Sequence, residues 1–312
     1  MLRYYSLRRH ARAFKDLTGI SVAEFEELFD RFEPAWVAAE EKRLRRSSRQ
    51  RAIGGGREYR LDNEDQLLMV LVWLRIYPTT ATLGYLFDLS QPTASRNSQR
   101  VLSVLNEFSK DEFEWPDPPK KYKGRSLSAL QQEYPDAFAI IDATEQPVER
   151  PKDREQEKLH YSGKRRRPTC KASIVVNEDG IIRGVTESAP GRTHDLTQIR
   201  QSGLLAHIPQ AVTVIADAGY DGLYKDLPNH SLATSHKAQR NHPLEQAHKD
   251  MNRELSSVRI IVENVFCHLK HFKILYDCFR HDVTDVHSAA FAVVAAIVNQ
   301  RTKRRLALAD VG

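Results

Sequence analysis

The feature that most constrains the fold of this chain is a pair of apolar runs that each end in an aspartate. Residues 137–141 (AFAII) lead into Asp142, and residues 212–216 (VTVIA) lead into Asp217. Short apolar runs that contain β-branched residues are typical of buried strands. Open α/β sheets place their sites at the carboxyl ends of parallel strands. We therefore expect two buried strands whose aspartates lie at one edge of a sheet.

The composition allows for more than one domain and for a nucleic-acid partner. The chain has 312 residues, against roughly 150 for a domain, and 41% of them are hydrophobic. Its net charge of +6 and pI near 9.1 fit a polyanion partner without proving one. The basic residues gather in three clusters, at residues 42–60, 164–167 and 301–305. Each cluster either binds a polyanion or is an ordinary solvated surface.

The cysteine content and the apolar segments argue for a reducing, aqueous compartment. Only three cysteines occur, without a Cys-x-x-Cys pair, which argues against a disulfide framework and a structural zinc. Residues 1–5 lack the apolar core of a signal peptide. The longest apolar stretch, 289–298, is about half the length that a bilayer span requires. We expect a soluble intracellular protein.

The first 56 residues predict a helical and basic segment. Residues 22–41 have apolar positions at the spacing of an amphipathic helix, which Pro34 is expected to break. Three consecutive glycines at 54–56 predict a hinge. We place a domain boundary at this hinge.

Residues 57–112 show a helix-turn-helix pattern. Asp62 is expected to cap one helix, and a short helix over 79–87 is followed by a tight turn and a helix from Gln91, capped by Ser90. The second helix of such a motif carries side chains that reach bases and phosphates. The expected DNA-binding residues on it are Thr93, Ser95, Arg96, Asn97 and Arg100. An ordinary three-helix bundle with a polar face explains the segment equally well.

The second half of the chain predicts an α/β domain. Residues 113–133 contain three prolines among charges and predict a linker. The expected strands are 137–141, 171–177, 181–187, 212–216 and 232–235, with helices at 194–206, where Thr193 is the expected cap, 245–272 and 283–304. This order is that of a ribonuclease-H-like α/β fold with a mixed five-stranded sheet. In such a fold, three strands joined by hairpins are followed by a helix, a further strand and closing helices. We assign this domain to residues 134–305 and a tail to 306–312.

In that order the first and fourth strands lie side by side and parallel, so Asp142 and Asp217 project together. Two carboxylates at such an edge can share divalent ions about 3.5–4 Å apart, and hard oxygen ligands favour Mg²⁺ or Mn²⁺. Glu263 would supply a third carboxylate, since helical spacing places Arg259, Glu263 and Lys270 within about 40° of one another. The acid can then face the metals while the two cations face phosphate. Taken alone, a strand-end aspartate is more often a turn former.

Four motifs follow one another in the order of a known family: IDATE at 141–145, YSGKRRR at 161–167, PGRTHD at 190–195 and ADAGY at 216–220. They resemble the DDE transposases of bacterial insertion sequences, in particular the insertion-sequence-five group, which is related to eukaryotic Harbinger transposases. The spacing of Arg259, Glu263 and Lys270 is similar to the family signature around the third acid, although Ser256 stands where the family often has tyrosine. The amino-terminal half, with AIGGG at 52–56 and LSQPT at 89–93, also looks like this group.

The resemblance implies a transposase that binds the terminal inverted repeats of its element, cleaves the element ends and joins the 3′-hydroxyls to target DNA. It implies Asp142, Asp217 and Glu263 as catalytic residues and as ligands of two Mg²⁺ (or Mn²⁺) ions, with no further cofactor and no covalent intermediate. It also implies a homodimer or larger assembly on double-stranded DNA in the bacterial cytoplasm, at the nucleoid.

Several residues near these motifs have more than one interpretation. Asp195 could replace Asp217 as the second metal-binding acid, or it could be an acidic residue that stabilises the amino terminus of a helix. His194 contacts DNA, orients Asp217 or packs in the interior, and Tyr220 stacks on a displaced base or belongs to the core. Glu145 is expected to be a hairpin residue near the site. Four residues form a basic hairpin: Lys164, Arg165, Arg166 and Arg167. The hairpin either binds phosphates or is a solvated surface loop. Arg259 and Lys270 are also expected to bind phosphates.

Two other functions remain open. One is a catalytically silent DNA-binding protein derived from a transposase, which the intact trio of acids disfavours. The other is a structure-specific nuclease on the same fold, such as a junction resolvase, which the helix-turn-helix pattern disfavours.

Overall fold

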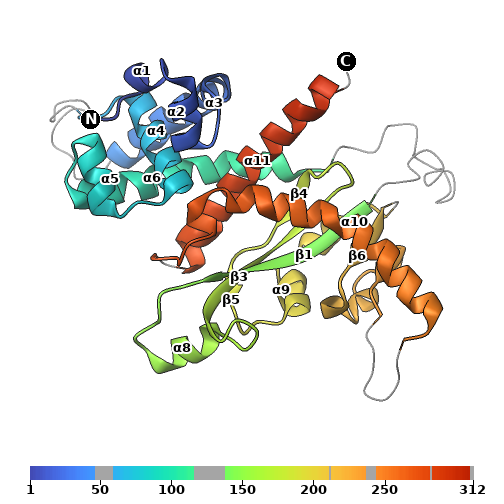
Figure 1. Cartoon of the computed structure of the whole chain (residues 1–312). Helices are drawn as coiled ribbons and strands as arrows, with labels where there is room; N and C mark the ends of the chain where they lie inside the picture. The colour runs from blue at the N-terminus through green and yellow to red at the C-terminus, as the bar shows by residue number, and fades with distance from the viewer. Residues whose placement is uncertain (46–58, 116–137, 211, 237–243, 282, 310–312) are drawn as a thin grey trace. The chain divides into compact units, whose positions relative to one another are not determined.

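A computed structural model of the chain describes residues 1–45, 59–115, 138–210, 212–236, 244–281 and 283–309 (Figure 1). The predicted hinge at 54–56 and most of the predicted linker lie outside these residues, as do the basic residues Arg49, Arg51 and Arg57. The chain divides into two compact units. The helical unit comprises Met1–Ser109 and Lys270–Asp277, and the sheet unit comprises Lys110–Leu269 and Cys278–Gly312.

The helical unit is built around one helix whose central residues are all buried. Its elements are α1 (Tyr4–Leu7), α2 (Ala11–Thr18), α3 (Val22–Leu44), α4 (Asn63–Ile76), α5 (Thr80–Phe87), α6 (Gln91–Ser109) and η6 (Lys273–Leu275). In α4 every residue from Asp65 to Leu74 is buried, as expected of a helix that is apolar on all sides. As predicted, Asp62 caps this helix by accepting a hydrogen bond of 2.9 Å from the backbone N–H of Asp65.

The predicted break of the helix at Pro34 is wrong, because α3 continues through Pro34 to Leu44. A proline inside a helix removes one hydrogen bond and costs about 3 kcal/mol. Burial of Phe25, Phe32 and Trp36 on one face of α3 offsets that cost. The start of the helix is also fixed by a capping box between Ser21 and Glu24.

The helices α5 and α6 form the predicted pair joined by a short turn. Asp88 ends α5 in the left-handed conformation, with φ of 56°. Gly84 lets the turn fold closely onto α5, since a Cβ at this position would lie 2.6 Å from the carbonyl oxygen of Leu89. The turn therefore requires both a residue that tolerates positive φ and a residue without a side chain.

The sheet unit contains the predicted strands and two short additional ones. Its strands are β1 (Phe138–Pro147), β2 (Tyr161–Ser162), β3 (Arg167–Val176), β4 (Ile182–Val185), β5 (Ala189–Pro190), β6 (Thr213–Ala216) and β7 (Leu232–Thr234). Its helices are η1 (Lys110–Phe113), α8 (Arg154–His160), α9 (Asp195–Gln201), η3 (Leu204–His207), η4 (Ala218–Tyr220), η5 (Leu223–Lys225), α10 (Gln246–Lys270, whose last residue belongs to the helical unit), the π-helix η7 (Val283–His287) and α11 (Ser288–Ala309).

The strand order defines the fold. β1 pairs antiparallel with β3 and parallel with β6, β6 pairs parallel with β7, and β4 pairs antiparallel with β3. The order β4-β3-β1-β6-β7 is that of a mixed, ribonuclease-H-like sheet. The two-residue strands β2 and β5 pair with β3 on the edge away from β1, as β4 does. The predicted fold class is confirmed.

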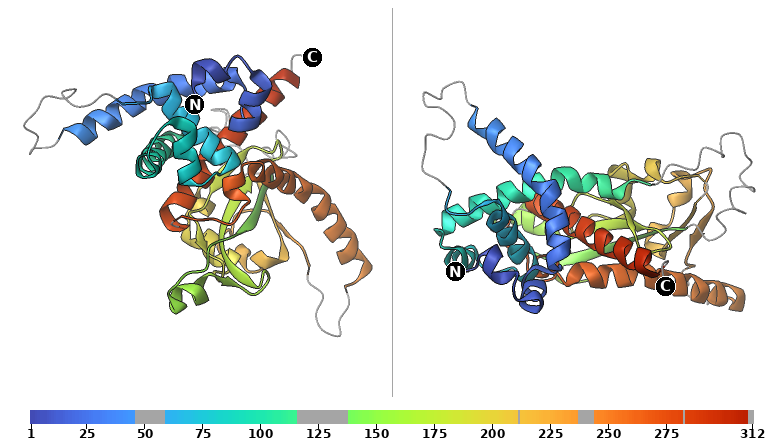
Figure 2. Two further views of the ribbon diagram at one scale, coloured as in Figure 1. Left: turned by 60° about the vertical axis from the view of Figure 1, so that its left-hand side comes forward. Right: turned by 90° about the horizontal axis from the view of Figure 1, so that it is seen from above.

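The two faces of the sheet are covered by different helices (Figures 1 and 2). On one face, Ile141 of β1 and Val214 of β6 form a buried cluster with Leu196 and Ile199 of α9. α10 lies on the opposite face and buries one stripe of side chains at helical spacing. Successive residues of a strand point to alternate faces, so Asp142 and Ile141 point to opposite faces and Asp142 points toward α10.

Three details of the predicted elements in the sheet unit are wrong. β1 does not end at Asp142, because its pairing with β3 continues to Pro147 opposite Thr169. His194 rather than Thr193 caps α9, since its ring accepts a hydrogen bond from the backbone N–H of Leu196. α9 ends at Gln201, and a separate 3-10 turn, η3, follows it. In the described part of the chain, no helix is both long and apolar enough to cross a membrane.

Candidate active site

Asp142 and Asp217 lie next to each other at the edge where β1 and β6 stop pairing. The last paired positions of these parallel strands are Ile141 and Ala216, and each aspartate is the next residue. Residues at the same level of neighbouring parallel strands point to the same face. The negative charge of Asp217 contributes to the raised pKa of Asp142, as expected of two close carboxylates. The structure thus brings these two predicted residues together.

The carboxylate of Asp142 is held from two sides. Its Oδ1 accepts a hydrogen bond of 2.8 Å from the backbone N–H of Ala143, and its Oδ2 accepts one of 3.0 Å from Nη2 of Arg259 on α10. Burial raises the pKa of Asp142 above its ordinary value, and the positive charge of Arg259 opposes that rise. Because burial prevails, the ionised carboxylate lacks full compensation by positive charge.

Asp217 is held by the turn that follows β6. Its Oδ1 accepts a hydrogen bond of 2.7 Å from the backbone N–H of Gly219, which closes the first turn of η4. A Cβ on residue 219 would lie 2.8 Å from the same oxygen, so only glycine fits there without moving the carboxylate. The turn fixes the Asp217 carboxylate beside Asp142.

Glu263 lies on α10 one turn after Arg259, and its side chain is exposed. Residues four apart on a helix share a face, so Glu263 is on the side of α10 that carries Arg259. Arg259, and not Glu263, contacts Asp142. Among the described residues, no three acids, histidines or cysteines are close enough together to hold a metal ion. Lys270 is the last residue of α10 and belongs to the helical unit.

Asp142 and Asp217 nevertheless fit a divalent cation. Both are hard oxygen donors of the kind that Mg²⁺ and Mn²⁺ prefer. The Asp142 carboxylate, with a side chain that is 16% exposed, is also short of positive charge, as its raised pKa shows. A cation at this edge would supply that charge, with Asp142 and Asp217 as its protein ligands.

A second cluster of charges centres on Lys171, which the sequence had not indicated as a site residue. The buried Nζ of Lys171 lies 2.7 Å from Oδ1 of Asp195 and 3.7 Å from Oε1 of Glu145. Glu145 is three residues after Asp142 on β1, so it points to the opposite face of the sheet. A lysine within the mostly apolar second half of β3 was the only local signal. Asp195 lies in the first turn of α9 and is tied to this cluster.

Two further groups have clear positions. The basic hairpin is the turn between β2 and β3, and all of its cationic side chains are exposed: Lys164, Arg165, Arg166 and Arg167.

Tyr220 is 1% exposed and belongs to the buried cluster on the α9 face. Tyr220 therefore packs in the core and does not present its ring for stacking.

On α6, the predicted DNA-binding residues differ in their surroundings. Arg96 is exposed, and Thr93 and Ser95 are half-buried on the first turns. Asn97 is 4% exposed and accepts a hydrogen bond from Arg100. Arg100 also pairs with Glu40 of α3 at 3.2 Å and lies over the ring of Trp36. Asn97 and Arg100 are thus held by contacts within the helical unit.

Comparison with known families identifies the class of protein. Residues 141–299 match the family described as "DDE superfamily endonuclease", and residues 59–109 match the "Helix-turn-helix of DDE superfamily endonuclease". The first match includes Asp142, Asp217 and Glu263, and the second spans α4, α5 and α6. The chain belongs to the DDE superfamily of endonucleases and carries the helix-turn-helix of that superfamily.

The similar proteins include two from bacterial insertion sequences. The chain is 31% identical over 272 residues to the "Probable transposase for insertion sequence element IS702" of Microchaete diplosiphon, covering 87% of this chain and 88% of that protein. It is 25% identical to the transposase assigned to insertion sequence element IS112 of Streptomyces albus G, covering 78% and 82%. A solved structure, a pre-cleavage Mos1 transpososome, matches with 12% identity and a TM-score of 0.19, covering 86% of this chain and 84% of that one.

Proposed function

We propose that this protein is a DDE transposase of the insertion-sequence-five group. It binds the terminal inverted repeats of its own element, hydrolyses the phosphodiester at the element ends and joins the freed 3′-hydroxyls to target DNA. It acts in the bacterial cytoplasm, where the nucleoid lies, as a homodimer or larger assembly on two DNA ends. Residues 57–112 serve DNA binding and residues 134–305 serve catalysis.

The observation that carries the proposal is the convergence of Asp142 and Asp217 at one edge of the sheet. The register of β1 and β6 supports their role as metal ligands, because it aims both carboxylates toward α10. Glu263 would complete the set from α10, one turn beyond Arg259. Two Mg²⁺ or Mn²⁺ ions, when bound, activate the attacking water or 3′-hydroxyl and stabilise the leaving oxygen.

The cations near the acids would bind the DNA backbone. Arg259 pairs with Asp142 at 3.0 Å in the free protein. If a cation took over the Asp142 carboxylate, the guanidinium of Arg259 would be free to pair with phosphate oxygens, which it can do in a forked geometry. The exposed basic hairpin at residues 164–167 would extend this contact along the backbone, and Lys270 at the end of α10 would also bind phosphate. Lys171 would pair with Asp195 on α9, whose carboxylate lies on the same side of Gly219 as that of Asp217.

Cleavage of element ends tests the catalytic part of the proposal. Inverted repeats in the DNA that flanks the gene would define the substrate duplex, which is incubated with the protein and Mg²⁺. Cleavage should occur at the element boundary and fall by about 10³-fold or more in Asp142→Asn, Asp217→Asn and Glu263→Gln, because each variant loses a charged metal ligand. Asp221→Asn is a matched control, since Asp221 is an exposed acid four residues after Asp217.

The outcomes separate the alternatives. Binding of the repeat without cleavage by the wild type would indicate a silent DNA-binding protein. Equal cleavage of branched duplexes that lack the repeat would indicate a structure-specific nuclease. If all three acid variants cut as fast as the wild type, the metal ligands lie elsewhere.

The salt dependence of DNA binding tests the role of α6. Arg96→Ala should weaken binding to all duplexes and reduce the slope of log affinity against log salt concentration by about 1. Arg8→Ala is the control, because Arg8 is an exposed arginine of the same unit that pairs with Glu26 and lies outside the basic clusters. An unchanged slope in the Arg96 variant would remove this residue from the DNA interface.

A further inference from the structure

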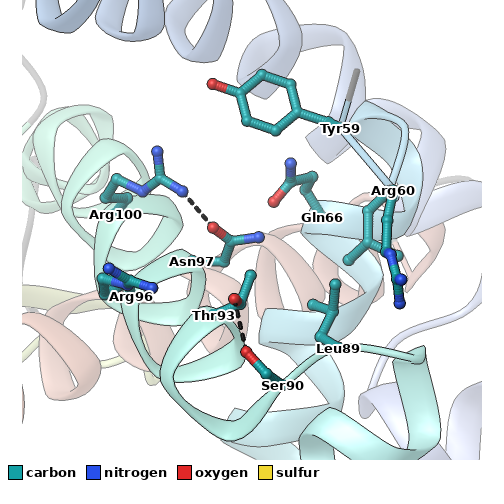
Figure 3. A pocket seen from close by; sticks show the side chains of 10 residues that line it. Tyr59, Arg60, Gln66, Leu89, Ser90, Thr93, Arg96, Asn97 and Arg100 are labelled. Atoms are coloured by element: carbon teal, nitrogen blue, oxygen red, sulfur yellow. Dashed lines mark hydrogen bonds between the residues drawn. The ribbon is translucent and has the colours of Figure 1, made fainter. Parts of the chain in front are cut away.

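A pocket of about 450 Å³ lies at the first turns of α6, within the helical unit (Figure 3). Its volume falls within the ~300–1,000 Å³ that is usual for small-ligand sites. Tyr59, Gln66, Leu89, Thr93, Arg96 and Asn97 are among the residues that line it. The pocket therefore joins the buried helix α4, through Gln66, to the exposed start of α6.

A buried amide in this pocket has no partner among the residues that the structure describes. Gln66 is 1% exposed, and its Oε1 accepts no hydrogen bond from any of them. Buried polar side chains nearly always have partners, so an exception calls for a reason. Figure 3 shows the amides of Gln66 and Asn97 turned toward the same space, below the ring of Tyr59. Two amides in one pocket match the paired donors and acceptors at the edge of a nucleobase.

The charge of the pocket favours an anionic ligand. Its described lining includes Arg60, Arg96 and Arg100 but no acidic residue. Arg60 and Arg100 are paired with Asp88 and Glu40. Within the described residues, Arg96 forms no ion pair and donates only to the backbone oxygen of Pro92. The amino terminus of α6 adds a partial positive charge.

The remaining surfaces of the pocket suit a flat ring. Leu61 and Leu89 provide apolar walls, and the aromatic ring of Tyr59 stands at one side. Bases stack on aromatic side chains whatever their sequence. The combination of a ring, apolar walls, two amides and a cation at the mouth matches one nucleotide: a base inside and its phosphate beside Arg96.

We propose that this pocket holds a single unstacked nucleotide displaced from DNA bound along α6. The proposal rests on the proposed function in one respect, because Thr93 and Arg96 line the pocket and are also expected contacts of the DNA. The displaced base lies beside Tyr59 and pairs with the amides of Gln66 and Asn97. A free nucleotide has the same chemistry, and its separate binding is one arm of the test.

Binding of three labelled duplexes to the full-length protein tests the proposal. One duplex is fully paired, one carries a single-nucleotide bulge of 2-aminopurine, and one carries an abasic bulge with the same backbone. We expect the base-containing bulge to bind about tenfold more tightly than the abasic bulge, or about 1.4 kcal/mol. The fluorescence of 2-aminopurine should change on binding, because the base moves from the duplex into the pocket.

Gln66→Met is the decisive variant. Methionine has a similar volume and removes the unpaired amide, so folding should be retained, with an equal or higher melting temperature. The tenfold preference for the base-containing bulge should disappear. Gln99→Met is the matched control: it makes the same substitution at an exposed position of α6 that does not line this pocket, and it should keep the preference.

Three outcomes overturn the inference. Equal affinity for the two bulges excludes a base in the pocket, and a preference that survives in Gln66→Met places the base elsewhere. Saturable binding of free deoxyadenosine monophosphate, without a preference between bulges, would exclude DNA as the source. Failure to bind any duplex would instead contradict the proposed function, whereas equal binding to all three contradicts only this inference.

Discussion

Each unit of the molecule contains a carboxylate paired with arginine, and the two pairs differ in how well the negative charge is compensated. In the helical unit, Glu40 accepts hydrogen bonds from Arg43 at 2.8 and 2.7 Å, from Tyr59 at 2.7 Å and from Arg100 at 3.2 Å. In the sheet unit, Asp142 accepts one hydrogen bond from Arg259 and one from a backbone N–H.

The pKa values of the two carboxyl groups shift in opposite directions. Burial would raise the pKa of Glu40, but the hydrogen bonds from Arg43 and Tyr59 and the charge of Arg100 lower it overall. Burial raises the pKa of Asp142, and Arg259 only partly opposes the rise. The ion pairs of Glu40 thus stabilise the fold. The negative charge of Asp142 is only partly compensated, and a further cation would compensate it.

Removing the charge of Asp142 should lower cleavage activity without lowering stability, and this is the largest effect that we expect. Asp142→Asn should reduce cleavage by about 10³-fold or more, since a metal ligand is lost. Its free energy of unfolding at neutral pH should be equal to or higher than that of the wild type, because a poorly compensated buried charge is removed. Urea unfolding and cleavage measured on the same preparation give both quantities. A clear loss of stability would show that Asp142 is satisfied by Arg259 alone.

Loss of the Glu40 charge should have the opposite effect. Glu40→Gln leaves Arg43 and Arg100 without a negative partner and should lower the free energy of unfolding by about 1–3 kcal/mol. The fluorescence of Trp36, over which Arg100 lies, reports unfolding of the helical unit. Glu41→Gln is the matched control, because its exposed pair with Arg45 should contribute less than about 1 kcal/mol. Equal effects of the two substitutions would contradict a structural role for Glu40.

Divalent cations should stabilise only the sheet unit. Mg²⁺ or Mn²⁺ at ten times its dissociation constant should raise the free energy of unfolding by about 1.4 kcal/mol. Melting temperatures with and without Mn²⁺ should show this rise in the wild type and in Glu40→Gln, and its loss in Asp142→Asn and Asp217→Asn. A rise that persists in both aspartate variants would place the cation elsewhere.

The pH dependence of stability should distinguish the pairs by sign. The pKa of Glu40 lies below its ordinary 4.5 in the folded state, so its contribution is present above pH 4.5 and is lost as the pH falls through the folded pKa. The pKa of Asp142 lies above its ordinary 3.8, so ionisation destabilises the folded state as the pH rises above 3.8. Destabilisation by Glu40→Gln should therefore fade in acid, and stabilisation by Asp142→Asn should grow as the pH rises. Urea midpoints across this range measure both differences, and parallel profiles would contradict the contrast.

The sequence predicted the elements of the site better than its contacts. Apolar runs and the spacing on α10 correctly indicated the parallel pair β1 and β6 and the shared face of Arg259 and Glu263. They did not indicate that Arg259 pairs with Asp142, 117 residues away along the chain. Nor did they reveal the cluster around Lys171, because a single lysine in a strand has no periodic signal. Such pairs depend on which strand and helix faces meet.

The continuation of α3 through Pro34 has the same explanation. A proline is a local signal for a helix break, and its cost is local. The buried face of Phe25, Phe32 and Trp36 stabilises the continuous helix through contacts with the rest of the unit. Those contacts have no local trace in the sequence around residue 34.

By itself, the amino-acid sequence determined the order of strands and helices, the positions of the acids and the pattern of the helix-turn-helix, since these depend on hydrophobic periodicity and on turn residues. Only the tertiary structure decided which charges meet. It paired Asp142 with Arg259, enclosed Lys171 between Glu145 and Asp195, and left the amide of Gln66 without a partner in a pocket beside α6. The physical reason is that burial and charge compensation arise where distant segments pack together, and neither can be computed from neighbours in the chain.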